Sequence, residues 1–285
     1  MDLQNSLIFY NWMPCVADLV LDYPNEYYRE NGTIREHDKE NLSLDDICSM
    51  KENCKIFIKT DFLKNSGFQN TILPQIKKPF ILISGMSSFT VDNYQVILDS
   101  PFLVKWFCTN PPCEHDKIIG LPIGFEERNR EGGNQEVISK FLSEDREKNN
   151  KILLPYHTVG NNPARDSHIK HLQSLPFIDV QESKLPFSEY LELLSQYKYC
   201  ICLEGAGFDT HRNYECLLVG TVPIMKTSGV KLIYDDYNLP SVFVDDWSSI
   251  NADFFENLHE FEFDFSCCKT FLTVKTHMER IEKYV

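Results

Sequence analysis

The feature of this sequence that most constrains the fold is a series of short apolar runs separated by helical patterns. A strand covered on both faces need not alternate apolar and polar residues, so short runs of this kind are typical of buried strands. Strands that alternate with helices predict an α/β protein with mainly parallel sheets. The runs are Lys55–Lys59, Phe80–Ser84, Ile118–Ile123, Lys151–Pro155, Tyr199–Leu203, Thr221–Met225 and Val242–Val244, and helical stretches such as Ser188–Gln196 and His211–Val219 lie between them.

A change of character at Glu126–Asn150 suggests where two domains meet. This segment is crowded with Glu, Arg, Asn and Gly, whereas the 285 residues of the chain are enough for two cores. We predict one α/β domain over residues 1–145 and a second over 150–265. The tail, residues 267–285, carries apolar residues at helical spacing. We expect it to form an amphipathic helix that packs across the domain junction.

The composition narrows the classes of partner. The formal net charge is −14, and such a chain is a poor candidate for binding nucleic acid, because neutralising phosphates needs a basic surface. The sequence shows no signal-peptide pattern at its start, and no run approaches the roughly 18 apolar residues that span a bilayer. Ten cysteines without a Cys-x-x-Cys pair are typical of free, mostly buried thiols in a reducing compartment. We therefore expect a cytoplasmic protein with no membrane span.

The segment Tyr199–Lys226 carries the chemistry, with the pattern strand, glycine loop, helix, strand. Gly205 and Gly207 allow a sharp turn and expose backbone N–H groups. Asp209 or Thr210 is expected to cap the following helix. The N-terminus of that helix would present unpaired N–H donors and partial positive charge, which suit a diphosphate. Gly220 suits the C-terminal end of the helix.

Two charged residues on this helix point to a ligand. Arg212 and Glu215 are three residues apart and share one face, while Tyr214, Leu217 and Leu218 would face the core. Arg212 is suited to gripping phosphate oxygens, and Glu215 to accepting hydrogen bonds from ribose hydroxyls. The alternative is a surface ion pair between the two side chains with no ligand.

The combined pattern resembles the C-terminal signature of exostosin-like glycosyltransferases. The matching residues are Gly205-Ala-Gly-Phe-Asp-Thr-His-Arg-Asn-Tyr-Glu215, Gly220-Thr-Val-Pro-Ile224 and Leu239-Pro240 with Val244-Asp-Asp-Trp247. Weaker matches lie upstream at Lys77–Ser84 and within Lys105–Gly124. The resemblance therefore reaches from about Ile56 to Trp247. Glu204 departs from the pattern, because an acidic residue beside a diphosphate is unfavourable, and the family's membrane anchor is not seen.

The resemblance implies a GT-B fold, with two Rossmann-like domains facing a central cleft and the C-terminal helix crossing back. It also implies an inverting, metal-independent transfer of a sugar from a UDP-sugar, with UDP-xylose the first guess, to the hydroxyl of a glycan acceptor. No cofactor is expected beside this co-substrate. The expected donor-binding residues are His157, Thr158, Arg165, Gly205, Ala206, Gly207, Asp209, His211, Arg212 and Glu215, with Lys226 and Ser228 as further candidates.

An inverting transfer needs a base that takes the proton of the attacking hydroxyl. Asp61, just past an apolar run, is the first candidate, and its alternative role is to cap a helix. Asp92 is the second candidate and His115 the third. The nearest approach to a metal-binding Asp-x-Asp motif is Glu260-Phe-Glu-Phe-Asp264, which alternation on a solvated strand explains, so no metal site is predicted.

Two other functions are compatible with an α/β protein that carries a glycine loop. A non-catalytic nucleotide- or glycan-binding protein of the same fold would share every feature except the base. An NAD-dependent oxidoreductase is disfavoured, because Thr210 stands where the third glycine of Gly-x-Gly-x-x-Gly belongs. Lys226 also stands where an acidic residue would bind the ribose of NAD.

Overall fold

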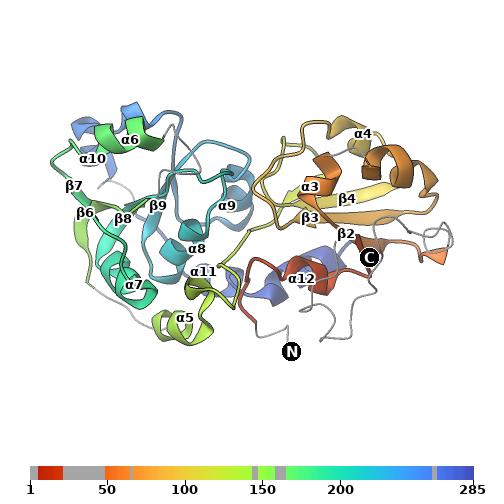
Figure 1. Cartoon of the computed structure of the whole chain (residues 1–285), viewed down its shortest axis with the longest axis horizontal. Helices are drawn as coiled ribbons and strands as arrows, with labels where there is room; N and C mark the ends of the chain where they lie inside the picture. Colours follow the sequence, from red (N-terminus) through yellow and green to blue (C-terminus); the bar gives the residue numbers. More distant parts are fainter. Residues whose placement is uncertain (1–5, 22–48, 65–66, 143–146, 158–164, 259–261) are drawn as a thin grey trace. The chain divides into compact units, whose positions relative to one another are not determined.

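A computed structural model describes residues 6–21, 49–64, 67–142, 147–157, 165–258 and 262–285. The chain forms two compact units (Figure 1). The first unit contains Met1–Ile123 and Thr273–Val285, and the second contains Gly124–Leu272. Each unit has its own parallel sheet of five strands. The predicted α/β class, with a parallel sheet in each half of the chain, is confirmed.

The sheet of the first unit has the strand order β1-β2-β3-β4-β5, and all neighbouring strands are parallel. On one face, Ile56, Ile58, Leu82 and Trp106 belong to a buried apolar cluster. The indole N–H of Trp106 donates to Ser84 Oγ at 2.8 Å inside the sheet. The strands are β1 (Leu19–Leu21), β2 (Cys54–Lys59), β3 (Phe80–Gly85), β4 (Leu103–Cys108) and β5 (Ile118–Gly120).

Short helices connect these strands, and the last helix of the chain packs on the same unit. The ring of Tyr284 contacts Phe107 edge-on at 5.9 Å, and Glu282 forms an ion pair with Lys55. The C-terminal segment therefore packs against β2 and β4 of the first unit. The helices are η2 (Met13–Val16), α3 (Thr60–Lys64), η3 (Phe68–Ile72), η4 (Leu73–Gln75), α4 (Gln95–Leu98) and α12 (Val274–Glu282).

The sheet of the second unit has the order β10-β9-β8-β6-β7, again all parallel. The chain runs from β6 to β7 on one side and then returns to place β8 on the other side of β6. The strand order thus reverses between β6 and β8, and in open parallel sheets ligands bind outside the carboxyl ends of the strands at such a point. The strands are β6 (Asn149–Leu154), β7 (Ile178–Val180), β8 (Tyr197–Ile201), β9 (Val222–Lys226) and β10 (Val242–Val244).

Helices cover both faces of this second sheet (Figure 1). Residues of α6 and α10 share one apolar cluster with Ile152, Tyr199 and Ile224. On the other face, α7 packs on β8 and α8 packs on β9, and α7 and α8 contact each other. The helices are η5 (Glu131–Gly133), α5 (Gln135–Phe141), α6 (Arg165–Leu172), α7 (Phe187–Ser195), α8 (His211–Leu218), α9 (Lys231–Tyr237), η6 (Trp247–Ser249), α10 (Ala252–Leu258) and α11 (Cys268–Phe271).

Every apolar run that predicted a strand contains one, and the structure adds three that the sequence analysis missed. The strands β1 and β7 have three residues each, and Asp179 interrupts the apolar residues of β7. In β4, Lys105 interrupts the apolar run, and its ammonium group donates to the carbonyl of Asp116 at the surface. A polar residue within a strand was thus mistaken for the absence of a strand.

The units differ from the predicted domains in two places. The division lies between Ile123 and Gly124, earlier than the predicted boundary, because Glu131 accepts the N–H of Phe187 and α5 packs on α7. The single helix expected over residues 267–285 is instead two helices. Thr273 separates them and forms an antiparallel bridge with Leu7. Consequently α11 belongs to the second unit and α12 to the first.

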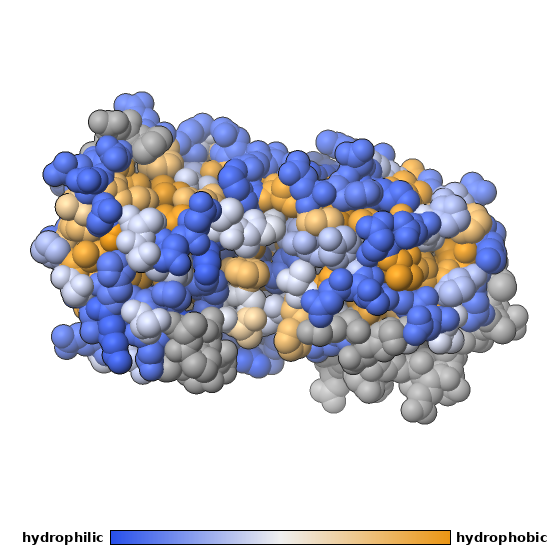
Figure 2. All heavy atoms as spheres, turned by 90° about the horizontal axis from the view of Figure 1, so that it is seen from above, coloured by the Kyte–Doolittle hydropathy of each residue, from blue (hydrophilic) through white to orange (hydrophobic). Residues whose placement is uncertain are grey.

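Hydrophilic side chains cover much of the face seen in Figure 2, with smaller hydrophobic patches between them. Exposed large apolar side chains include Phe89 in the first unit and Phe208 in the second. None of the helices in the described part of the chain combines the length and the hydrophobicity that crossing a bilayer would require.

Candidate ligand site at the carboxyl edge of the second sheet

A pocket of about 540 Å³ lies at the carboxyl edge of the second sheet. Tyr156 and His157, which follow β6, line it together with Gln181, which follows β7. Further lining comes from Arg165 at the start of α6, from α7 and α8, and from residues 126–132. The pocket lies beside β6, next to the point where the strand order reverses. Four predicted donor-binding residues meet here, namely His157, Arg165, Arg212 and Glu215.

Three uncharged groups hold the guanidinium of Arg212. Its Nε donates to the hydroxyl of Tyr190 at 3.2 Å, and its Nη2 donates to the carbonyl of Tyr156 at 3.2 Å. Its Nη1 lies 2.5 Å from Nε2 of His157. The ring of Tyr190 also lies under the guanidinium, 5.8 Å from its carbon. Arg212 therefore carries its charge on a fixed guanidinium in a pocket wall, which is the property that an anion-binding arginine needs.

His157 is neutral in this arrangement. Its Nδ1 lies 2.6 Å from the carbonyl of Pro155, which can only accept, so Nδ1 carries the proton and Nε2 accepts from Arg212. Burial, and after it the positive charge of Arg212, lowers the pKa of His157 to about 2. His157 therefore positions Arg212 and does not act as a proton acceptor for a substrate.

Glu215 is buried, with 8% of its surface exposed. Burial raises the pKa of its carboxyl group to about 7, although Arg212 and a hydrogen bond from Tyr190 act in the opposite direction. Among the described residues, no ion pair within 4 Å joins Glu215 to Arg212, so the alternative of a surface ion pair is wrong. A carboxyl group close to half-protonated near neutral pH can both donate to and accept from a ligand hydroxyl.

Arg165, the first residue of α6, contacts the loop that follows β8. Its Nε donates to the carbonyl of Glu204 at 2.6 Å. The carboxylate of Glu204 points away from that contact, because Oε2 accepts from the indole N–H of Trp247 at 3.0 Å and Oε1 lies 3.7 Å from Lys226 Nζ. The acidic residue that departs from the family pattern is thus neutralised inside the fold. Lys226, a further donor candidate, is its counter-ion.

Acidic residues of the pocket rim are also satisfied by protein groups. Glu131 accepts the N–H of Phe187 at 2.9 Å and lies 3.3 Å from Lys184, and these contacts lower the pKa of its carboxyl group. Glu126 accepts the N–H of Gly132 at 3.2 Å and pairs with Arg130 at 3.4 Å. The rim charges therefore cancel locally, which leaves Arg165 and Arg212 as the cations of the pocket wall.

The glycine loop lies outside the pocket lining. Gly205 donates its N–H to the carbonyl of Gly207 at 2.9 Å. Neither glycine has a positive φ, whereas Gly220 does, with φ 70°, just after α8. The predicted role of Gly220 as the C-terminal end of the helix is confirmed. A Cβ at Gly205 would come no closer than 3.6 Å to Arg165 Nη2, so the conformation of this loop does not by itself require that glycine.

Of Asp209 and Thr210, the two predicted caps of α8, Thr210 occupies the cap position, although its side chain makes no capping hydrogen bond. Asp209 is buried instead, and its two carboxylate oxygens accept from Asn213 Nδ2 at 3.0 Å and Tyr214 Oη at 2.5 Å. Aromatic packing decided this, because Tyr214 faces the core and its hydroxyl needs an acceptor there.

His211, at the start of α8, also contacts the protein itself. Its Nδ1 lies 2.7 Å from the carbonyl of Gly124, and burial lowers its pKa. Gly124 has φ 73°, a conformation that directs its carbonyl toward the ring. Together with Gly205, Ala206, Gly207 and Asp209, His211 is thus a predicted donor residue that does not line the pocket. Thr158 lies outside the described residues.

The candidates for the catalytic base belong to the first unit. Asp61 lies in the first turn of α3, directly after β2, and its carboxylate is 3.8 Å from Lys59 Nζ. Asp92 is exposed in the turn before α4. His115 is exposed, and its Nδ1 accepts the N–H of Lys117 at 3.0 Å. Of the possible metal motif, Asp264 accepts from Ser266, and residues 260 and 261 lie outside the described part.

Sequence reasoning missed Tyr156 and Tyr190, which hold Arg212. Tyr156 stands beside His157 at the end of an apolar run, so its place at a strand end was visible. Tyr190 sits on α7 with Phe187 three residues earlier, a spacing that predicts a core face. Only the packing of α7 against α8 shows that its hydroxyl reaches Arg212 and Glu215.

Comparisons with known proteins find similarity only among solved structures. No family model matches the sequence, and no curated protein matches it. The structure of the GtfA/B complex aligns over 84% of this chain and 56% of its own chain, with 10% identity and a TM-score of 0.39. The structure of a glycotransferase of kitacinnamycin aligns over 81% of this chain and 75% of its own, with 9% identity and a TM-score of 0.34.

This chain therefore spans less than two thirds of the first of these structures. Both TM-scores lie below 0.5, so the assignment of the fold rests on the two parallel sheets themselves. The resemblance to exostosin-like transferases stays a prediction.

Proposed function

We propose that this protein is a glycosyltransferase and that the pocket of the second unit binds the nucleoside diphosphate of a nucleotide sugar. The observation that carries the proposal is the fixed guanidinium of Arg212, held by three uncharged groups in a pocket at the carboxyl edge of a parallel sheet. A diphosphate is the ligand that a half-buried guanidinium with uncharged hydrogen-bond partners at this edge suits best.

The roles proposed for the pocket residues follow from their contacts. Arg212 and Arg165 bind the diphosphate oxygens and stabilise the negative charge that grows on the leaving group as the sugar departs. Glu215, whose carboxyl pKa is about 7 because of burial, exchanges hydrogen bonds with the ribose hydroxyls. His157 and Tyr190 keep Arg212 in place without neutralising it.

The proposed transfer inverts the configuration at the anomeric carbon and uses no metal ion. A carboxylate takes the proton of an acceptor hydroxyl, the hydroxyl oxygen attacks the anomeric carbon, and the bond to the nucleoside diphosphate breaks. Asp61 is the first candidate for this base and Asp92 the second. The proposed donor is a UDP-sugar, with UDP-xylose first, and the proposed acceptor is a glycan hydroxyl, as exostosin-like transferases would use.

The test is a panel of nucleotide sugars with EDTA present, read by thermal shift and by release of nucleoside diphosphate. One UDP-sugar is expected to stabilise the protein, and Arg212→Gln is expected to weaken its binding by about 10- to 150-fold, the equivalent of one charged hydrogen bond. Lys231→Gln is the matched control, because the side chain of Lys231 is 45% exposed, pairs with Asp235 and does not line the pocket.

Asp61→Asn separates catalysis from binding. It is expected to abolish release of the nucleoside diphosphate and to leave stabilisation by the UDP-sugar unchanged. Stabilisation without release in the wild type, with any acceptor offered, would instead support the non-catalytic binding protein. If no nucleotide sugar changes the melting temperature, the transferase proposal fails.

A further inference from the structure

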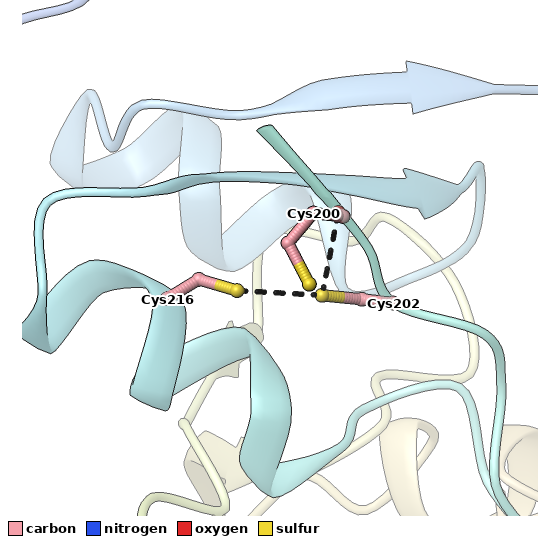
Figure 3. A group of neighbouring side chains, drawn as sticks. All are labelled: Cys200, Cys202 and Cys216. Carbon is pink, nitrogen blue, oxygen red and sulfur yellow. Dashed lines mark hydrogen bonds between the residues drawn. The ribbon is translucent and has the colours of Figure 1, made fainter. Parts of the chain in front are cut away.

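Behind the helix that carries Arg212 lies a cluster of three cysteines that the proposed transfer does not use. Cys200 is in β8, Cys202 follows its end, and Cys216 is in α8 (Figure 3). Their sulfur atoms all lie within 4.8 Å of one another, and Sγ of Cys202 is 3.7 Å from Sγ of Cys216. The three residues are between 0% and 2% exposed. We define them as the trithiol cluster.

The geometry of the cluster follows from local structure. Residues two apart in an extended segment face the same side of the sheet, which brings Cys200 and Cys202 together beneath α8. Cys216 is on the buried face of α8 and points toward them (Figure 3). All three side chains come from regular structure or its immediate end, so their sulfur atoms are positioned before any ligand binds.

The spacing of the sulfur atoms fits one metal ion. Thiolates about 2.3 Å from a central ion are about 3.8 Å apart in a tetrahedral arrangement and about 4.0 Å apart in a trigonal one. The 3.7 Å between Cys202 and Cys216 is close to both values. A disulfide would need a separation of about 2.05 Å, so this pair would have to move much further to form one.

The donor set selects the ion. Soft thiolates favour cuprous copper and zinc over hard cations. A structural zinc site takes four protein ligands, and a catalytic zinc site takes three with a water in the fourth position. Within the described residues, no further His, Cys, Asp or Glu joins the three sulfur atoms, and their burial leaves no room for bulk water. Three thiolates suit a cuprous ion, because three such ligands complete its coordination.

We propose that Cys200, Cys202 and Cys216 form a binding site for a single cuprous ion, which ties β8 to α8. Three thiols lose their protons to solvent, three copper–sulfur bonds form, and the oxidation state of copper does not change. The site is structural and lies behind the wall that carries Arg212. It does not depend on the proposed transfer, in which no metal takes part.

The test is the copper content of the protein, purified under reductant without oxygen from copper-supplemented cells and challenged with the cuprous chelator bathocuproine disulfonate. The wild type is expected to retain one cuprous ion per chain. Mutating a residue that only hydrogen-bonds a metal ligand typically lowers metal affinity by about 10- to 100-fold. Loss of a ligand in Cys202→Ala or Cys216→Ala is therefore expected to lower the affinity at least about a hundredfold. Cys54→Ala and Cys108→Ala, at buried cysteines of the first unit, are the matched controls.

X-ray absorption by the copper-loaded wild type is independent of any variant and of its folding. The proposal predicts three sulfur neighbours and no nitrogen or oxygen. Two sulfur neighbours, equal copper retention by Cys202→Ala and the wild type, or preferential retention of zinc with an oxygen ligand would each overturn it.

Discussion

Nη1 of Arg212 and Nε2 of His157 are 2.5 Å apart, although the two residues are 55 positions apart in the chain. The contact joins the first turn of α8 to the segment that follows β6. Because Nδ1 of His157 is committed to the carbonyl of Pro155, the ring offers Arg212 a lone pair and no charge. A histidine and an arginine that both line the pocket thus act as one cationic group.

The first prediction concerns His157 and acid. Burial and the adjacent Arg212 lower the folded-state pKa of His157 to about 2, so between pH 7 and pH 5 only the unfolded chain takes up this proton. Stability is therefore lost as the pH falls through the unfolded pKa of about 6.5, by about 2 kcal/mol at pH 5. His157→Gln keeps an acceptor for Arg212 and cannot titrate, so it is expected to remove this loss. Urea unfolding of both proteins at pH 7 and pH 5 measures it, and equal losses would contradict the assignment.

The second prediction concerns Glu215, whose contribution to folding stability changes with pH in the opposite direction. Burial raises its folded pKa to about 7 from 4.5, so the unfolded chain releases this proton at lower pH than the folded one. Its contribution to stability therefore declines as the pH rises from 5 to 8, by about 2–3 kcal/mol. Glu215→Gln is expected to abolish that decline in urea unfolding at the two pH values. Glu189→Gln, at an exposed site on α7, is the control, and a decline that survives in Glu215→Gln would rule out the raised pKa.

The third prediction concerns the buried pair of Asp209 and Tyr214, whose oxygen atoms are 2.5 Å apart. Asp209→Asn and Tyr214→Phe are each expected to lower the free energy of unfolding by about 1–3 kcal/mol. Because they share one hydrogen bond, the double variant should lose less than the sum, with a coupling of about 0.5–3 kcal/mol. Tyr199→Phe is the control, since its hydroxyl donates to the carbonyl of Leu258. Its loss should add to that of Asp209→Asn, and additivity of the first pair would contradict the contact.

The fourth prediction tests the unit to which the C-terminal helix belongs. Ile281 of α12 is 1% exposed, and α12 is part of the first unit. Ile281→Ala is expected to cost about 2–5 kcal/mol through the cavity it leaves. Amide hydrogen exchange should then accelerate in β2 and β3 and stay unchanged in β8 and β9. Leu258→Ala in α10 is the matched control and should give the reverse pattern. Equal acceleration in both sheets after Ile281→Ala would show that α12 does not belong to the first unit alone.

The sequence by itself determined the local elements. Seven apolar runs predicted strands that are present, and the helix over α8 with Gly220 at its end was predicted within a residue. It also singled out His157, Arg165, Arg212 and Glu215, which meet in one pocket. These features depend on the periodicity of apolar residues, on local backbone conformation and on where strands end. Residues close together in the sequence determine all three.

Only the tertiary structure decided which of these groups are charged and what they contact. Strand order put β6 beside β8, so that Arg165, at the start of α6, reaches Glu204 after β8. Packing of α7 on α8 brought Tyr190 to Arg212, and packing of α8 on the sheet brought Cys216 to Cys202. The same burial moved the pKa values of His157 and Glu215. Such contacts join residues many positions apart, and the loss of water around them depends on the whole fold, so no local pattern encodes them.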